Sequence, residues 1–306
     1  MRKTFATTLQ KLAEENKDII LQTGDLGFGV FDSFIKNFPD RYINAGVAEA
    51  QMISSAAGLA LEGYRPICYS IASFATARPF EQIRHCLAYS NLPVIIVGAG
   101  RGLRYTKEGP THHAIDDLAL MSSLPGMNVI IPADPFEVKK LLPQAFNLKG
   151  PTYFTIGKYG EKDLLSKSNP VIGKLRKIAN GEKVAIFCIG EIAIQVENAL
   201  NILKIQGISP SAYHVHTLKP LDQKKLADIS KKIKTFLVIE EHRPIGGLYS
   251  AIELWNRSNS NCVKISRLSL PDTFVLGNLA YDEAIEKYEL NSVSIANKCL
   301  EIWENI

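Results

Sequence analysis

Three short segments of the sequence carry the side chains best suited to acid–base chemistry. Residues 41–61 (RYINAGVAEAQMISSAAGLAL) hold one carboxylate, Glu49, in a stretch that is otherwise almost uncharged and rich in small residues. The second segment is SFATARPFEQIR (73–84), and the third is GRGLRYTKEGPTHHAIDD (100–117), a glycine-rich loop with the adjacent histidines His112 and His113. Long loops with converging polar residues are usually functional. By position alone, Glu49 also fits an acid that complements a helix dipole.

These segments must be held by a fold in which strands and helices alternate. Apolar, β-branched runs at 18–23, 65–71, 92–100, 128–133 and 152–156 predict strands that are buried on both faces. Helical periodicity lies between them, at 48–61, 79–90, 114–123 and 135–148. Such alternation predicts a mostly parallel sheet covered by helices. Ligands of these sheets bind at the carboxyl ends of the strands, where the three segments are expected to lie.

A second α/β series follows a change in composition. Residues 157–182 lose the apolar rhythm and accumulate Lys, Ser, Asn, Pro and Gly, which is typical of a linker. Beyond it, strands are predicted at 183–190, 211–217, 235–241 and 262–268, with helices at 191–206, 247–257 and near the C-terminus. We therefore predict an α/β fold of two domains, each a mostly parallel sheet flanked by helices. The first domain covers 1–160, a linker 161–180 and the second domain 181–306.

Composition restricts the class of protein. The 306 residues are 46% hydrophobic and 22% charged, as in an ordinary globular chain, and a net charge of only +4 disfavours a nucleic-acid groove or a membrane surface. No apolar run reaches the roughly 20 residues of a membrane span. An odd number of cysteines with no CxxC pair fits reduced thiols, so a cytoplasmic location is expected. These cysteines are Cys68, Cys86, Cys188, Cys262 and Cys299.

Three longer stretches resemble one family. DRYINAGVAEAQMISSAAGLALEGYRP (40–66), GPTHHAIDDLALMSSLPGMNVIIPAD (109–134) and IEEHRPIGGLYSAI (239–252) are similar to the C-terminal half of transketolase, meaning its pyrimidine-binding domain followed by its C-terminal domain. The resemblance runs over essentially the whole chain, in the right order and spacing. It extends to 1-deoxyxylulose 5-phosphate synthase and, more loosely, to the β subunits of 2-oxo acid dehydrogenases.

The resemblance implies a thiamine diphosphate enzyme of which this chain is one part. Full-length members hold the diphosphate and Mg²⁺ through a Gly-Asp-Gly motif on a separate N-terminal domain, and this sequence has no Gly-Asp-Gly. The implied protein is the C-terminal subunit of a split transketolase, which joins an N-terminal diphosphate-binding subunit in an α₂β₂ heterotetramer. In carbohydrate metabolism it would transfer a two-carbon ketol unit from a ketose donor to an aldose or sugar acceptor.

The resemblance also assigns roles to individual residues. Glu49 matches the glutamate that hydrogen-bonds N1′ of the cofactor pyrimidine and so favours the imino tautomer that deprotonates C2. Phe74 matches an aromatic residue that stacks on the pyrimidine, with Phe80 as the competing candidate. His112 matches the histidine that faces the substrate and can share protons with it. His113 is expected to be structural.

The remaining site assignments concern the cofactor's edge and the substrate. Asp25, in TGDLG, falls where the family has an acidic residue near the pyrimidine, although a turn aspartate explains it almost as well. Glu108 stands where transketolases use an aspartate to sense the donor hydroxyl. Sugar-phosphate transketolases carry an arginine after the last strand of this domain, and here the nearest cation is Lys158, which lacks the bidentate fork. Further basic residues in the 100–117 loop favour an anionic sugar substrate.

Several alternatives stay open at this stage. The substrate could be a sugar phosphate or a nucleotide-linked sugar, and the chemistry could be that of a deoxyxylulose phosphate synthase. A 2-oxo acid dehydrogenase β subunit would instead acylate lipoamide. A noncatalytic scaffold would have no use for a desolvated carboxyl at Glu49. In the second domain, His242 matches an interdomain signature of the family, whereas His214 and His216 lack further ligands at zinc spacing and are expected to be sheet residues.

Overall fold

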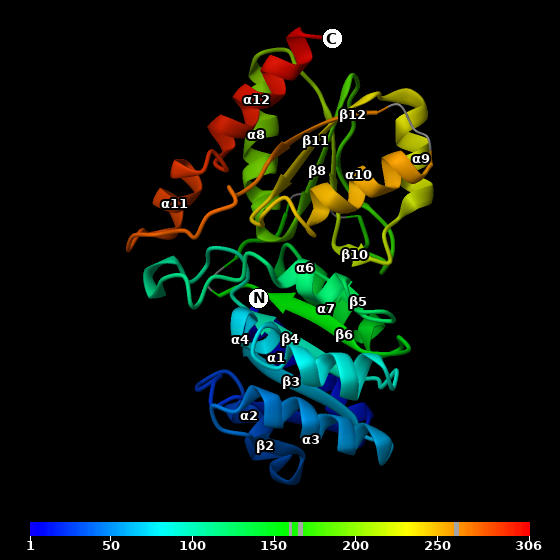
Figure 1. Cartoon of the computed structure of the whole chain (residues 1–306), viewed down its shortest axis with the longest axis vertical. Coiled ribbons are helices and arrows are strands. Elements are labelled where there is room, and N and C mark those ends of the chain that lie inside the picture. The colour runs from blue at the N-terminus through cyan, green and yellow to red at the C-terminus, as the bar shows by residue number, and fades with distance from the viewer. Residues whose placement is uncertain (159–160, 165–167, 260–262) are drawn as a thin grey trace.

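The chain folds into two α/β domains stacked along the long axis of the molecule (Figure 1). The structure is a computed structural model that describes residues 1–158, 161–164, 168–259 and 263–306. Cys262 lies outside the described residues, and the other four cysteines are free thiols. The predicted α/β class, with two mostly parallel sheets flanked by helices, is confirmed.

The first domain is built on a sheet with the strand order β10-β5-β6-β4-β3-β1-β2. Its neighbouring strands are parallel except for β10 and β5. The strands contributed by the first half of the chain are β1 (Ile19–Thr23), β2 (Tyr42–Asn44), β3 (Arg65–Ile71), β4 (Ile95–Ala99), β5 (Asn128–Ile130) and β6 (Thr152–Ile156). The helices are α1 (Arg2–Glu15), α2 (Asp32–Asn37), α3 (Glu49–Leu61), α4 (Ala72–Thr76), α5 (Phe80–Gln82), α6 (Asp117–Ser122) and α7 (Pro135–Ala145). Shorter turns are η1 (Pro39–Arg41), the π-helical η2 (Ile83–Ala88) and η3 (Thr106–Glu108).

Two helices of this domain differ from their predicted extents. The helix expected over 79–90 is divided into α5 and the π-helical turn η2. The helix expected over 114–123 begins only at Asp117, because Ala114 forms a β-bridge with Gly102 that keeps the preceding backbone extended. This bridge closes the 100–117 loop at its base. The short elements α2 and β2 were not predicted at all.

The second domain is built on a smaller sheet with the strand order β12-β11-β8-β9-β7. Its strands are β7 (Arg176–Ala179), β8 (Val184–Ile189), β9 (Ser211–His214), β11 (Thr235–Glu240) and β12 (Lys264–Leu268). They are covered by η4 (Gly190–Ile192), α8 (Ala193–Ile205), α9 (Gln223–Lys232), α10 (Leu248–Ser258), α11 (Tyr281–Lys287) and α12 (Ser292–Glu304). All described pairs are parallel except β7 with β9.

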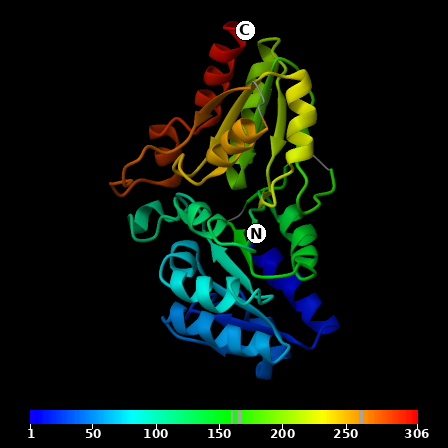
Figure 2. The ribbon, with the colours of Figure 1, turned by 45° about the vertical axis from the view of Figure 1, so that its right-hand side comes forward.

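Two short strands tie the halves of the chain together, and the sequence analysis missed both. The run 211–217 was predicted as one strand, but it divides into β9 and the start of β10 (Thr217–Lys219). β10 pairs antiparallel with β5 of the first sheet, at the boundary between the two domains (Figure 1 and Figure 2). β7 lies in the range expected to be a linker. Its Arg176 is fully buried and forms ion pairs with Asp134 (2.8 Å) and Glu137 (2.9 Å) of the first domain. This polar range therefore contains a buried residue, Arg176, that joins the two domains.

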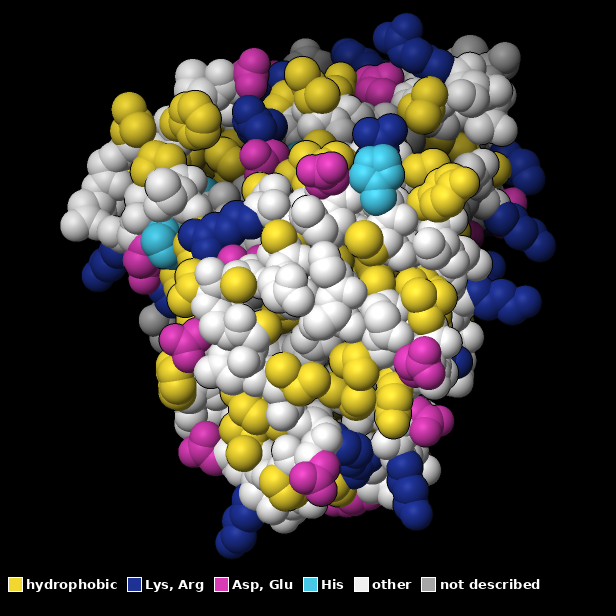
Figure 3. Space-filling view, turned by 60° about the horizontal axis from the view of Figure 1, so that its bottom comes forward, with side chains coloured by type: hydrophobic (Ala, Val, Ile, Leu, Met, Phe, Trp, Pro, Cys, Tyr) yellow, Lys and Arg dark blue, Asp and Glu magenta, His cyan; other side chains and the backbone are white. Residues whose placement is uncertain are grey.

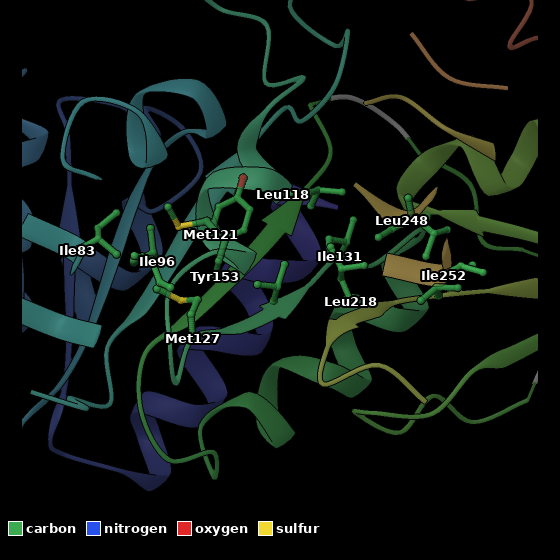
Figure 4. Close-up of a cluster of buried hydrophobic side chains, with 14 of the residues drawn as sticks. Ile83, Ile96, Leu118, Met121, Met127, Ile131, Tyr153, Leu218, Leu248 and Ile252 are labelled. Atoms are coloured by element: carbon green, nitrogen blue, oxygen red, sulfur yellow. The ribbon is translucent and has the colours of Figure 1, made fainter. Parts of the chain in front are cut away.

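Apolar packing also crosses the domain boundary. One cluster of buried side chains runs from the interior of the first sheet to α10 of the second domain (Figure 4). Its labelled members are Ile83, Ile96, Leu118, Met121, Met127, Ile131, Tyr153, Leu218, Leu248 and Ile252. Because α6 lies in the middle of this cluster, the segment that follows the 100–117 loop is anchored by both domains.

The β2 end of the first domain exposes several apolar side chains. Figure 3 looks onto this end and shows apolar side chains lying among polar ones. Exposed members near β2 and α3 include Ile43, Val47, Leu61 and Tyr64. Among the described residues, no helix has both the length and the apolar character needed to cross a membrane.

Candidate active site

Glu49 is the first residue of α3, and its carboxylate is almost completely buried. The residue is 3% exposed. The Ser70 hydroxyl donates a hydrogen bond to Oε1 (3.2 Å), and Nη1 of Arg78 donates to Oε2 (3.0 Å). An acid in the first helical turn complements the dipole, but that role needs no burial. Burial of a carboxylate is costly unless it is paired, so the position indicates a use beyond helix capping.

Arg78 makes two contacts at once. Phe74 lies on α4, and Arg78 follows it by four residues. The Arg78 guanidinium lies over the Phe74 ring, with Cζ 3.8 Å from the ring centroid. A planar group thus donates to the Glu49 carboxylate while it stacks on an aromatic face. An aminopyrimidine with its N1′ directed at Glu49 would make the same two kinds of contact.

His112 extends this cluster along the 100–117 loop. Its ring lies 4.9 Å from the Phe74 ring, edge to face, and 6.1 Å from the Tyr105 ring, centroid to centroid. Nδ1 of His112 shares a hydrogen bond of 2.9 Å with the Thr111 hydroxyl. His113 points inward instead: burial lowers the pKa of its imidazole, and Nε2 lies 3.4 Å from the Thr106 carbonyl.

Lys158 and Glu108 form the next contact in the row. Lys158 Nζ lies 2.8 Å from Oε1 of Glu108 and 3.7 Å from the centroid of the Tyr105 ring. Partial burial works to raise the pKa of Glu108, but the hydrogen bond and charge of Lys158 hold it below its ordinary value. Lys158 also lines a cavity of about 770 Å³ beside α1, together with Arg2 and Lys3. The lining carries both signs of charge: Arg2, Lys3 and Lys158 are joined by Asp32 and Glu161, so the cations outnumber the acids by one.

Asp25 lies in the loop after β1, beside the Glu49 site. Its backbone has φ of 56°, a conformation that aspartate tolerates better than most residues. Its amide donates to Oδ1 of Asn44 (3.1 Å), and the Asn44 amide donates back to Asp25 Oδ1 (2.9 Å). The preceding Gly24 lies against the Ser70–Glu49 pair, because a Cβ there would be 3.3 Å from Ser70 Oγ and 3.6 Å from Glu49 Oε1. The exposed Asp25 side chain therefore has a structural partner in this state.

The structure brings five of the six predicted site residues into one continuous row. The row runs through Glu49, Arg78, Phe74, His112, Tyr105, Lys158 and Glu108. Asp25 lies one loop away, and the competing candidate Phe80 packs against the hydrophobic core. Sequence reasoning missed Arg78 and Tyr105. Arg78 had only a partial signal: it stands four residues after Phe74 in the 73–84 segment, but no helix was predicted over these two positions.

The arrangement suits the pyrimidine end of a thiamine cofactor. It offers a buried carboxylate for a ring nitrogen, an aromatic face for the ring and a histidine beside them. Among the described residues, no group of three or more His, Cys, Asp or Glu side chains is placed to hold a metal ion.

Comparison with known families matches both halves of the chain. Residues 1–159 match the family described as "Transketolase, pyrimidine binding domain", and residues 173–295 match "Transketolase, C-terminal domain". These matches agree with the placement of the two sheets.

Individual relatives cover the chain nearly end to end. A protein of Methanocaldococcus jannaschii named as a transketolase C-terminal section is 34% identical and covers 98% of this chain and 95% of the relative. A protein of Phocaeicola vulgatus named as one subunit of an apulose-4-phosphate transketolase is 29% identical, with 98% of this chain and 96% of the relative covered. A solved structure described as "Split gene transketolase, inactive beta4 tetramer" has a TM-score of 0.90 at 30% identity and covers 99% of this chain and 98% of its own. The chain also matches 1-deoxy-D-xylulose-5-phosphate synthases, of whose length it spans about half.

Proposed function

Because the chain belongs to the transketolase family, we propose that it is the pyrimidine-binding, C-terminal subunit of a two-subunit transketolase that depends on thiamine diphosphate. The observation that carries this proposal is the buried Glu49 carboxylate. Arg78 connects this carboxylate to Phe74, and Phe74 in turn contacts His112. The two contacts of Arg78, a hydrogen bond to Glu49 and stacking on Phe74, are those that we expect of a bound pyrimidine.

The residues of this chain fit the pyrimidine part of the cofactor. When bound, thiamine diphosphate would supply a nucleophilic carbon that adds to the ketose carbonyl. Glu49 would hold the hydrogen bond to N1′ and exchange a proton with that atom, in a pocket dry enough for the bond to matter. Phe74 would stack against the ring once Arg78 has moved away. Gly24 keeps a side chain away from the Ser70–Glu49 pair, since a Cβ there would be 3.3 Å from Ser70 Oγ.

We infer that His112 exchanges protons with the substrate. Its ring contacts Phe74 on one side and approaches Tyr105 on the other, so it lies between the cofactor face and the Lys158 pair. An imidazole in this place can donate to or accept from hydroxyl and carbonyl oxygens of a sugar. Glu108, held by Lys158, would accept from a donor hydroxyl.

We propose an anionic sugar, with sugar phosphates as the leading class. Lys158, Arg2 and Lys3 line one cavity of about 770 Å³, in which they outnumber the acidic Asp32 and Glu161, and the volume is large enough for the far end of a sugar phosphate. The relative from Phocaeicola vulgatus, whose name specifies a phosphorylated sugar, supports this class. A lysine binds phosphate as a point charge.

The diphosphate and Mg²⁺ are assigned to a partner subunit. This sequence lacks the Gly-Asp-Gly motif of full-length family members. One relative is named as a subunit, and a similar chain has been solved as an inactive β4 tetramer. We therefore propose an α₂β₂ assembly with an N-terminal diphosphate-binding subunit. The four described cysteines are free, which is in keeping with a reducing compartment such as the cytoplasm.

Reconstitution tests the proposal. The isolated chain should bind no measurable thiamine diphosphate, whereas a mixture with the diphosphate-binding subunit should bind it and transfer ketol units from a ketose phosphate to an aldose phosphate. Mg²⁺-dependent cofactor binding by the isolated chain would refute the split arrangement. Release of CO₂ from a 2-oxo acid without ketol transfer would instead assign the deoxyxylulose phosphate synthase or 2-oxo acid dehydrogenase class.

A further inference from the structure

The second domain turns a potential ligand-binding edge toward the 100–117 loop. In its sheet β8 and β11 are neighbours, while β9 lies beyond β8 and β12 beyond β11. The chain therefore continues in opposite directions from these two strands, and open α/β sheets bind ligands in the crevice at such a point, outside the carboxyl ends of the strands. The residues that follow β8 and β11 include Glu191 and Glu241. Both carboxylates are directed at the first domain.

A segment of the first domain occupies this crevice. Oε2 of Glu241, a residue only 3% exposed, accepts a hydrogen bond from the Leu103 amide (3.2 Å). Gly102 lies directly against the same carboxylate, since a Cβ at Gly102 would be 2.6 Å from Glu241 Oε2. Gly102 also has φ of +66°, which favours glycine. The backbone of residues 102–103 is thus fitted to Glu241.

Arg104 makes a further contact between the 100–117 loop and the second domain. Its Nη2 forms an ion pair of 2.6 Å with Oε2 of Glu191. Its guanidinium lies 3.8 Å from the centroid of the Tyr281 ring, and the Tyr281 hydroxyl donates to Glu241. Burial raises the pKa of Glu191 to about 7, although the charge of Arg104 opposes that rise. Arg104, from the first domain, therefore stabilises the charged form of the buried Glu191 carboxylate in the second domain.

These contacts reach the substrate side of the candidate active site through the backbone. Gly102 and Ala114 exchange two hydrogen bonds (3.0 and 3.1 Å), and this bridge closes the loop on which Glu108 and His112 lie. On the other side of the bridge, the Arg243 amide donates to the Ile115 carbonyl (3.2 Å). The second domain therefore contacts both of the chain segments that form the Gly102–Ala114 bridge, at the base of the 100–117 loop.

We propose that Glu241 is a positioning residue for ketol transfer: it holds residues 102–104 in place and thereby sets the position of His112 against the cofactor face. Glu191 and Tyr281 support it through Arg104. The inference rests on the proposed transketolase function for its kinetic part and on the contacts alone for its structural part. It assigns a task to the second domain, which contributes none of the predicted site residues.

The structural part is tested on the free chain by amide hydrogen exchange. Glu241→Ala should accelerate exchange of the 101–114 segment roughly ten- to a hundredfold, the range expected when a hydrogen bond to a charged group is lost. Glu241→Gln keeps an oxygen that can accept from Leu103 and should exchange within about threefold of the wild type. Asp228→Ala, which removes an exposed carboxylate of the same domain, is the matched control. Unchanged exchange in Glu241→Ala would overturn the inference.

The kinetic part is tested in the assembly with the diphosphate-binding subunit. Glu241→Ala should lower kcat for ketol transfer about tenfold or more, while the Kd for thiamine diphosphate changes less than about twofold, and Glu241→Gln should restore most of the rate. An equal loss of cofactor affinity would mean a general structural effect and would overturn the positioning role. If Glu241→Ala does not fold, Tyr281→Phe removes only the hydroxyl and should shift exchange and kcat in the same directions by a few-fold. Absence of ketol transfer in the wild-type assembly would refute the proposed function, and the exchange result would still decide the structural part.

Discussion

Removal of Arg78 tests how the free chain keeps the Glu49 carboxylate buried. In Arg78→Ala the carboxylate, whose side chain is 2% exposed, retains the Ser70 hydroxyl but loses a guanidinium that is 46% exposed. Breaking a fully buried ion pair costs about 3–5 kcal/mol, whereas exposed pairs contribute about 0–1 kcal/mol. Because one partner is buried and the other half exposed, we expect the free energy of unfolding to fall by about 1–2 kcal/mol.

A double-mutant cycle separates the ion pair from other effects of the substitution. Glu49→Gln removes the charge that Arg78 neutralises, so Arg78→Ala should cost about 1 kcal/mol less in that background than in the wild type. Urea denaturation followed by both fluorescence and circular dichroism measures all four chains. Arg257→Ala, which removes an 84% exposed arginine paired with Glu253, is the control and should be nearly neutral. Additivity of the two site substitutions would refute a direct Arg78–Glu49 interaction.

Arg78→Ala should also change the affinity for the cofactor. In the proposed binding mode a pyrimidine takes the place of Arg78 against both Glu49 and Phe74, so the contacts of Arg78 would be lost when the cofactor binds. If these contacts stabilise the free chain by about 1.4 kcal/mol, a variant that lacks them should bind the cofactor about tenfold more tightly. We expect Arg78→Ala to lower the Kd for thiamine diphosphate in the assembly by about tenfold, measured by titration calorimetry. A higher Kd would show that Arg78 helps to hold the bound cofactor, and the competition argument would be wrong.

Four further outcomes are expected. Glu49→Gln should keep the fold but lower ketol transfer by roughly a thousandfold or more, because the amide cannot exchange a proton with N1′; wild-type turnover would contradict the assignment. His112→Ala should reduce kcat more than cofactor affinity, and the reverse order would place the histidine on the cofactor. Lys158→Ala should raise KM for a phosphorylated acceptor but not for an unphosphorylated one, and two unchanged KM values would move the phosphate elsewhere. Burial lowers the pKa of His216 to about 4 from 6.5, so the unfolded chain takes up a proton first as pH falls, and the stability associated with the neutral imidazole is lost below pH 6.5. Between pH 6.5 and 5 this loss amounts to about 1.5 kcal/mol, so His216→Gln should gain that much relative to the wild type in urea denaturation; parallel pH profiles would count against it.

The architecture could be predicted from the sequence, because the signals that specify strands and helices are local. Buried apolar runs and helical periodicity placed the main strands and most of the helices near their observed positions, and the alternation implied two mostly parallel sheets. The motifs around Glu49 and His112 were also readable, since each is a short continuous segment. Through the resemblance to transketolase, the missing Gly-Asp-Gly predicted a partner subunit.

Which distant residues meet could not be predicted, because it depends on how the elements pack. Composition placed Arg176 in a linker, yet it is a buried anchor, because its partners Asp134 and Glu137 belong to another domain. β10 joins the first sheet for a similar reason: strand pairing is set by three-dimensional proximity to β5, which no local pattern reports. The contact between Glu241 and Leu103 spans 138 residues of sequence. Local periodicity describes which face of an element is buried, whereas the partner of a buried charge depends on how the elements pack, and that packing places the second domain against the loop of His112.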